Sequence, residues 1–333
     1  MGSNLIPASK SGLVKGEALP PILDAAGKAA RFAYQEFFYG EIRNPHTRLA
    51  YHRAVKKFLL WCQDQDLELQ QISPGAVGHY LDQLKVTTSE GQQHAVAIST
   101  KKLALAALRH FFDALVTRHV VILNPAASVR GERYQVVEGK TPEITVPQAR
   151  KLLESIGTSH VVGLRDRAVI ATMIYTTARG GAVAKLRRRD FYFVGEQWSL
   201  RFHEKGGKSR EIPVRHDLKG YLSEYLDAAG LRDAPKDSPL FRTAVRKEKR
   251  LTQTALTTND VYRMIKRRMR DVGLPPELSS HSLRVAGITD LLSQGVPMED
   301  VQYLAGHADP RTTRLYDRRR RRVTQNIVER ISV

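Results

Sequence analysis

Apolar side chains recur at helical spacing through much of the first 125 residues. Asn44-Pro45 and Ser73-Pro74 each precede such a stretch, and a capping residue followed by proline is a typical helix start. A third stretch follows a polar, glycine-containing segment at 86–99. The three apolar stripes are Val55, Phe58, Leu59 and Cys62; Val77, Tyr80, Leu81 and Leu84; and Leu105, Leu108, Phe112 and Leu115. We therefore predict a flexible arm over residues 1–28 and a helical domain over residues 29–125.

Little periodic apolar content follows over residues 126–143, which we interpret as a linker. Thr145 with Gln148 three residues later fits a capping box that opens a second domain, residues 144–333. Its first helices are predicted at 145–157 and 163–177.

Two strands are predicted next, because Trp198, Leu200 and Phe202 alternate with polar residues, as do Ile212 and Val214. Between them lies a basic, glycine-rich hairpin tip at 204–210, and from residue 216 onward the pattern is again helical. The predicted fold class is mainly α with a small β-hairpin or sheet: a helical first domain and a mixed α/β second domain.

Composition and charge narrow the classes of protein. A hydrophobic fraction of 42% in 333 residues suffices for two cores. No apolar run reaches the ~18 residues that span a bilayer, so we expect a cytoplasmic protein without a membrane partner. The single cysteine, Cys62, excludes an internal disulfide and argues against a cysteine-rich zinc site.

The net charge of +19 predicts a polyanionic partner, most commonly nucleic acid. Residues 141–333 carry +14 of it and residues 1–140 carry +5. Charge that serves solubility alone and an anionic membrane surface are the alternatives, and the latter calls for a basic amphipathic helix with bulky apolar residues opposite.

Three short motifs carry candidate chemistry. His281 and Arg284 share one face of a helix start that Ser279 or Ser280 caps, where free backbone N–H groups already favour an anion. Tyr316 follows Gly306-His307 and is flanked by basic residues. Arg179 lies between an apolar helix and a glycine pair. Each motif by itself is better explained by ordinary surface or half-buried side chains.

Taken in order along the chain, these motifs and the Lys205 hairpin resemble the tyrosine recombinase (phage integrase) family, in its Cre/Xer-like two-domain form. That family orders an arginine in a helix-turn-helix, a lysine on a β-hairpin, a His-x-x-Arg, a Gly-His, and a tyrosine nine residues later. The matching residues here are Arg179, Lys205, His281, Arg284, His307 and Tyr316. The resemblance covers about residues 30–333 and is most specific over 281–307.

The resemblance implies a site-specific recombinase or integrase that cuts DNA through a 3′-phosphotyrosine, without metal, ATP or any cofactor. Arg179 and Arg284 are expected to clamp the phosphate, which suits bidentate, permanently charged groups. His281 or His307 is expected to accept the proton of Tyr316. Lys205 is expected to protonate the leaving 5′ oxygen, with Lys208 as the alternative lysine.

Two positions depart from the family pattern, because Ala182 stands where an acidic residue is usual and Val285 where histidine or arginine is common. Neither change removes a group expected to touch the phosphate. They question the support of Arg179, and hence the rate, but we still expect an active enzyme.

The resemblance further implies a nucleoid-associated protein whose partner is double-stranded DNA with an inverted-repeat site. It implies binding by a homotetramer that is a monomer or weak dimer when free. A short apolar stripe at 323–331 is interpreted as a terminal helix that docks on a neighbouring protomer, the alternative being packing on its own domain. The candidate DNA-contacting residues are Lys101, Lys102, Arg109, Arg187, Arg188, Arg189, Arg242 and Arg246. Other functions left open are a type IB topoisomerase and a catalytically silent DNA-binding protein on the same scaffold.

Overall fold

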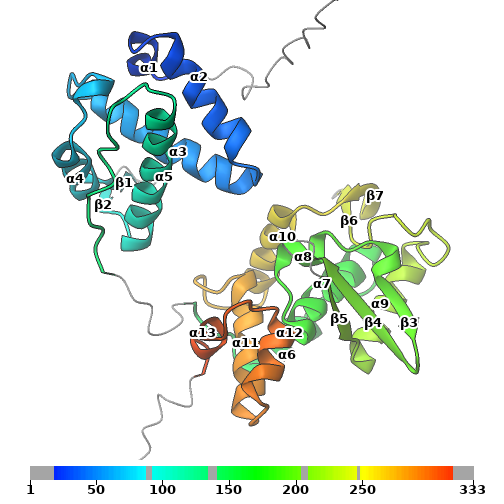
Figure 1. Cartoon of the computed structure of the whole chain (residues 1–333). Helices are drawn as coiled ribbons and strands as arrows, with labels where there is room; N and C mark the ends of the chain where they lie inside the picture. The colour runs from blue at the N-terminus through cyan, green and yellow to red at the C-terminus, as the bar shows by residue number, and fades with distance from the viewer. Residues whose placement is uncertain (1–18, 88–91, 134–140, 204–208, 246–247, 318–333) are drawn as a thin grey trace, which may run out of the picture. The chain divides into compact units, whose positions relative to one another are not determined.

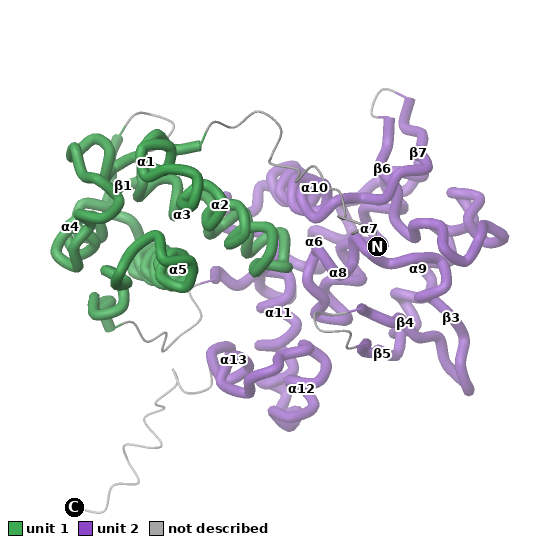
Figure 2. Tube along the Cα trace, turned by 45° about the horizontal axis from the view of Figure 1, so that its top comes forward, with its two compact units in different colours: residues 1–135 green, residues 136–333 purple. Residues whose placement is uncertain are grey.

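The computed structural model describes residues 19–87, 92–133, 141–203, 209–245 and 248–317. The chain divides into two compact units, residues 1–135 and 136–333, shown in green and purple in Figure 2. Each unit has its own hydrophobic core, so each is described by itself. The division falls inside the predicted linker at 126–143.

The first unit is a helical bundle whose helices begin where the sequence predicts. Asn44 caps α3 by accepting hydrogen bonds from the backbone N–H groups of His46 and Thr47, and Ser73 caps α4 by accepting from Ala76 N. Every residue of the three predicted apolar stripes is buried. The elements of this unit are α1 (Pro21–Ala25), α2 (Lys28–Glu36), the π-helix η1 (Phe37–Glu41), α3 (Pro45–Asp64), the 3₁₀ helix η2 (Leu69–Gln71), α4 (Pro74–Gln83), β1 (Lys85–Thr87), β2 (Gln93–Ala95) and α5 (Ile98–Thr117).

The described fold of the first unit extends beyond both ends of the predicted helical domain, residues 29–125. The end of the predicted arm is helical, because α1 lies within it and its Ile22 and Leu23 are buried in the core. The start of the predicted linker packs on the first unit. Ala126 is buried, and Arg109 donates hydrogen bonds to the carbonyls of Ala126 and Val129. The segment at 86–99 also holds an antiparallel strand pair, β1–β2.

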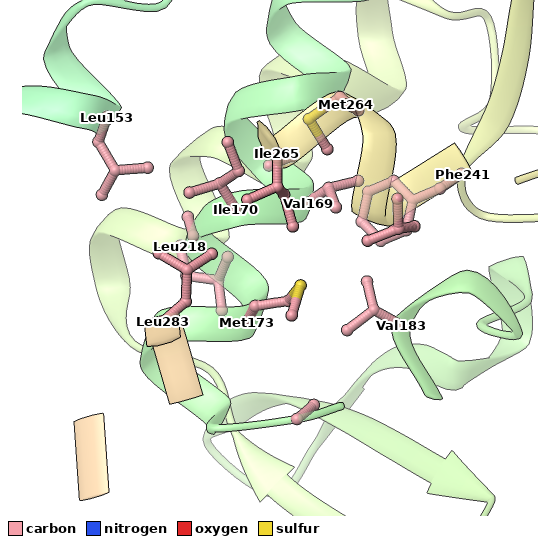
Figure 3. Packing of buried hydrophobic residues seen from close by; sticks show 14 of the residues in the cluster. Leu153, Val169, Ile170, Met173, Val183, Leu218, Phe241, Met264, Ile265 and Leu283 are labelled. Carbon is pink, nitrogen blue, oxygen red and sulfur yellow. The ribbon is translucent and has the colours of Figure 1, made fainter. Parts of the chain in front are cut away.

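The second unit packs its helices around α7 (Val161–Thr176), which is buried along most of its length. Figure 3 shows Val169, Ile170 and Met173 of this helix among side chains of α8, α9, α10 and α11. Thr145 and Gln148 form the predicted capping box of α6. The helices of this unit are α6 (Val146–Glu154), α7, α8 (Gly180–Ala184), the 3₁₀ helix η3 (Arg188–Asp190), α9 (His216–Ala228), α10 (Thr258–Asp271), α11 (Ser280–Ser293), α12 (Met298–Ala305) and α13 (Pro310–Arg314).

Two small antiparallel sheets complete the unit (Figure 1). The predicted hairpin is confirmed as β4 (Gln197–His203) paired with β5 (Ser209–Pro213), and β3 (Phe191–Val194) adds a third strand. The prediction of helix throughout the region after residue 216 was wrong over β6 (Arg242–Val245) and β7 (Arg250–Ala255), which pair with a shift in register. The sequence there does not alternate regularly between apolar and polar residues, which is the pattern that identifies a half-buried strand. The hairpin tip with Lys205 and the apolar stripe at 323–331 lie outside the described residues.

Candidate active site

The phenol of Tyr316 lies against the imidazole of His281. Tyr316 Oη is 3.3 Å from His281 Nε2, although 35 residues separate the two in the chain. Helix α11 presents His281 in its first turn, where Ser279 caps the helix as predicted. Tyr316 follows α13 directly, and Asp309 caps that short helix by accepting from Arg311 N. Helices α11, α12 and α13 lie together in both views of the unit (Figures 1 and 2).

His281 is suited to accept the phenolic proton. Its ring is desolvated by neighbouring groups, and the charges of Arg284 and Arg179 add to this, so its pKa is lowered from the ordinary histidine value. The imidazole is therefore neutral at neutral pH. A neutral ring with its lone pair on Nε2 accepts the proton that Tyr316 Oη donates.

His307 supports the tyrosine ring from the side. The two rings stack with centroids 5.7 Å apart and planes 8° from parallel. His307 Nδ1 lies 2.9 Å from the hydroxyl of the fully buried Thr313, which fixes the imidazole. Burial, followed by the charges of Arg284 and Arg179, lowers the pKa of His307 to about 3, so this ring stays neutral. Tyr316, only 9% exposed, is held in place rather than free to rotate.

Arg284 occupies the centre of the site and is only 1% exposed. Its guanidinium donates to two backbone carbonyls: Nη1 to Thr177 O, just after α7, and Nη2 to Ala305 O at 2.6 Å, at the end of α12. Carbonyls at helix ends have no partner within the helix. A single buried arginine therefore joins three helices and fixes a permanent positive charge beside both histidines.

Arg179 is exposed at the N-cap position of α8. Its charge lowers the pKa of both His281 and His307, so it lies within electrostatic reach of them. The glycine pair behind it allows close packing, because a Cβ on Gly180 or Gly181 would approach Val261 or Thr258 of α10 to 3.3 or 3.1 Å. The structure thus brings Arg179, His281, Arg284, His307 and Tyr316 together, whereas Lys205 is outside the described residues.

Several predicted DNA-contacting arginines have partners within the chain instead. Arg109 holds backbone carbonyls of its own unit, and Arg188 donates to the carbonyls of Leu231 and Arg232. Arg242 is only 8% exposed on β6. Arg109 and Arg188 are thus engaged within their own units and Arg242 is buried, and contact of these three residues with DNA stays a prediction.

The remaining candidates keep more of their surface. Lys102, Arg187 and Arg189 are exposed, although Arg187 donates to Asp237 O and Arg189 pairs with the Asp237 carboxylate. Lys101 forms an ion pair with Glu132, and Arg246 lies outside the described residues.

Helix α10 carries a basic surface that the sequence reasoning missed. Arg263 and Arg270 are exposed on it, and with Tyr262 and Lys266 they line a hollow of about 450 Å³ against Pro275 and Pro276. The sequence signal was the density of arginine and lysine at 263–270 on an otherwise amphipathic helix.

Over the described residues, no group of three or more histidine, cysteine or acidic side chains is placed to hold a metal ion. In that same part of the chain, no helix has the length and apolar character needed to cross a membrane.

Comparison with known proteins identifies the arrangement. Residues 143–322 match the phage integrase family, and residues 34–119 match the phage integrase N-terminal SAM-like domain. The first match covers more than half of the chain and contains all six predicted catalytic positions. The chain belongs to the phage integrase family.

Two curated relatives align with this chain over most of their length. Tyrosine recombinase XerC of Pelobacter propionicus is 28% identical over 277 residues, which cover 82% of this chain and 84% of the relative. Tyrosine recombinase XerD of Staphylococcus saprophyticus is 25% identical over 274 residues, 80% of this chain and 85% of the relative.

Solved structures agree with the fold. XerH site-specific recombinase bound to its palindromic difH substrate superposes with a TM-score of 0.69 at 20% identity, covering 94% of this chain and 98% of that one. A lambda integrase dimer bound to a COC′ core site superposes at 0.63 and 17% identity, covering 90% and 95%. The mainly helical fold with small antiparallel sheets is thus that of tyrosine recombinases.

Proposed function

We propose that this protein is a site-specific DNA recombinase that cuts and rejoins DNA through a 3′-phosphotyrosine on Tyr316. One observation carries the proposal: the phenol of Tyr316 lies 3.3 Å from a neutral imidazole, and two arginines place positive charge on the same site. A nucleophile, a base and a stabiliser of negative charge are the three parts that phosphoryl transfer to a side chain requires.

In the proposed step, Tyr316 Oη attacks the scissile phosphorus while its proton passes to His281 Nε2. The bond from Oη to phosphorus forms and the bond from phosphorus to the 5′ oxygen breaks. The leaving oxygen takes a proton from Lys205, which gives a free 5′-hydroxyl. Attack by a 5′-hydroxyl on the phosphotyrosine reverses the step, and because the covalent link conserves the bond energy, no ATP is consumed.

Arg179 and Arg284 are proposed to stabilise the negative charge on the phosphate. The attacked phosphate gains negative charge on its nonbridging oxygens, and guanidinium groups bind such oxygens in pairs. Arg284, fixed by two backbone carbonyls, is preorganised and loses little freedom when the phosphate arrives. Arg179 is exposed and approaches from the solvent side. These charges serve in place of a metal ion.

The DNA is proposed to meet the basic surface of α10, because an α-helix fits the major groove and Arg263 and Arg270 are exposed there. Lys102 of the first unit remains a candidate phosphate contact. Assembly on DNA into a homotetramer is proposed by analogy with lambda integrase, whose structure is described as a tetramer bound to a Holliday junction. An inverted-repeat site is proposed for this protein by analogy with XerH, whose difH substrate is described as palindromic.

The first test is formation of a covalent adduct. The protein is incubated in EDTA with nicked duplexes taken from inverted repeats near its gene, and protein–DNA adducts are separated on a denaturing gel. We expect an adduct with the wild type and none with Tyr316→Phe. The matched control is Tyr303→Phe, which removes the hydroxyl of an exposed tyrosine on α12 and should leave the adduct unchanged.

An adduct that persists in Tyr316→Phe, or that disappears in EDTA, would overturn the proposed chemistry. Strand exchange between two separate duplexes then distinguishes a recombinase from a type IB topoisomerase. Relaxation of supercoiled DNA without any exchange would favour the topoisomerase.

A further inference from the structure

Thr177 links the end of α7 to the end of α12, and the proposed reaction assigns it no chemical role. It follows α7 and precedes Arg179 by two residues, and it is only 1% exposed. Its backbone adopts φ 50° and ψ 21°, the left-handed region that side chains branched at Cβ rarely occupy. The other described non-glycine residues with positive φ, Asp66, His119 and Lys249, are all exposed and unbranched at Cβ.

A strained conformation at a buried position persists only where its surroundings fix it. Three contacts fix Thr177. Its carbonyl accepts a hydrogen bond from Arg284 Nη1. Its hydroxyl donates to Leu304 O at 3.1 Å. Its methyl lies against Gly287 of α11, where a Cβ would come within 2.9 Å of Thr177 Cγ2 and 2.8 Å of Ile174 O.

The contact with Leu304 O matters because of where α12 ends. The last carbonyls of a helix have no partner inside it, and α12 ends at Ala305 with Gly306 in the left-handed conformation. Leu304 O is taken by the Thr177 hydroxyl and Ala305 O by Arg284 Nη2. His307 follows two residues after Ala305, so these two bonds tie the chain that carries the stacked His307 and Tyr316 rings to the end of α7 and to α11.

We propose that Thr177 is a positioning residue: its hydroxyl bond to Leu304 O fixes the end of α12, and through it His307 and Tyr316, against Arg284 and Arg179. The inference deepens the proposed function and rests on it. A mutation far from the reacting atoms that displaces a reacting group by about 1 Å can lower the rate about 10²-fold. Loss of this single bond is therefore expected to slow cleavage without weakening DNA binding.

Three substitutions separate the hydroxyl from the backbone. Thr177→Ser keeps the hydroxyl, and Thr177→Val keeps the branched shape but leaves Leu304 O without a donor. Thr177→Gly also lacks the hydroxyl, yet glycine suits the positive φ better than threonine does. If Thr177 served only to make the turn, glycine would replace it without loss.

The measurements are the single-turnover rate of adduct formation on a nicked duplex at saturating protein, the affinity for the uncleaved duplex, and the melting temperature. We expect Thr177→Ser to react within about twofold of wild type, and Thr177→Val and Thr177→Gly to be at least about tenfold slower. Affinity should stay within about twofold for all three, because the Thr177 hydroxyl is bonded to Leu304 O and the substitutions leave every charged group of the site in place. The melting temperature establishes that each variant is folded under the assay conditions.

The outcomes are distinguishable from failure of the proposed function. If the wild type forms no adduct on its own site, the recombinase proposal fails. If the wild type reacts and Thr177→Gly reacts equally fast, the positioning role of the hydroxyl is wrong. A slow Thr177→Ser would overturn it as well, because that variant retains the bond to Leu304 O.

Discussion

The two histidines of the site differ in what they can do, although both are neutral. His281 faces the phenolic oxygen through Nε2, whereas His307 presents the flat of its ring to Tyr316 and points Nδ1 at Thr313. Only His281 is therefore placed to receive the proton. His307 instead restricts the phenol to one orientation. The sequence had left the role of base open between the two.

This assignment predicts an acid limit for cleavage that lies below the ordinary histidine pKa. His281 works in its neutral form, and its pKa is lowered from 6.5. The midpoint of the decline in rate should therefore lie below pH 6.5, as the imidazole becomes charged there. The measurement is the single-turnover rate of adduct formation from pH 4.5 to 8 at saturating protein.

Substitution of the base checks the assignment. His281→Gln keeps a polar side chain but cannot take a proton, so the plateau should fall by about 10²–10⁴-fold and the acid decline should vanish. A wild-type decline centred above pH 6.5 would contradict a neutral His281, and an unaltered profile in His281→Gln would contradict its role as base.

Among the elements, α7 and α10 are held together by a buried charge cluster. Asp166 of α7 is 0% exposed and accepts hydrogen bonds from three guanidiniums. Arg165 binds its Oδ1 at 2.6 Å, and Arg268 and Arg267 of α10 bind its Oδ2 at 2.7 and 3.1 Å. Arg165 also donates to Arg242 O of β6. One carboxylate thus keeps three positive charges close together, and two of them belong to α10, the helix of the proposed DNA-binding surface.

Removal of that carboxylate charge should be severe. Asp166→Asn leaves three guanidiniums without their counter-ion, and loss of one partner of a buried ion pair costs about 3–5 kcal/mol. For a unit of this size we expect the melting temperature to fall by on the order of 10 °C. Calorimetry or thermal circular dichroism provides the measurement.

A surface pair supplies the control for this cluster. Asp237→Asn breaks the exposed pair with Arg189 and should cost less than about 1 kcal/mol. Equal stability of Asp166→Asn and wild type would show that the cluster does not hold α7 to α10.

Helices were predictable because their buried apolar residues recur locally in the sequence, and at α3, α4 and α6 a capping residue, Asn44, Ser73 or Thr145, also marks the start. Strands β6 and β7 were not, since short strands depend on a partner distant in sequence and their side chains are mostly half-buried or exposed. The site residues could be predicted from the order of their motifs. The carbonyl bonds of Arg109, Arg188 and Arg284 depend on tertiary contacts, so the sequence could not reveal which arginines face solvent.

At the scale of the whole molecule, the two units share no core residue. The buried cluster of the first runs from Ile22 to Ala126, and those of the second lie between Ile144 and Tyr316. Every described contact of the active site joins residues of the second unit. The groups of the proposed chemistry described here thus all lie in one unit, and the first unit carries positive charge of its own, +5 over residues 1–140.

A fragment of residues 141–333 should therefore fold alone and still form the Tyr316 adduct. Its affinity for the duplex should be lower and less salt-dependent than that of the full chain, because fewer phosphates are neutralised. Raising the protein concentration should restore adduct yield, since the defect is in binding and not in the step at Tyr316.

The experiment has three parts. The first tests whether the fragment melts cooperatively, and the second titrates adduct against fragment concentration at two salt concentrations. The third repeats the titration with Tyr316→Phe in the same fragment. If the fragment melts without cooperativity, or forms adduct only when residues 1–140 are supplied as a second chain, the first unit contributes to the site itself and the separation of binding from chemistry is wrong.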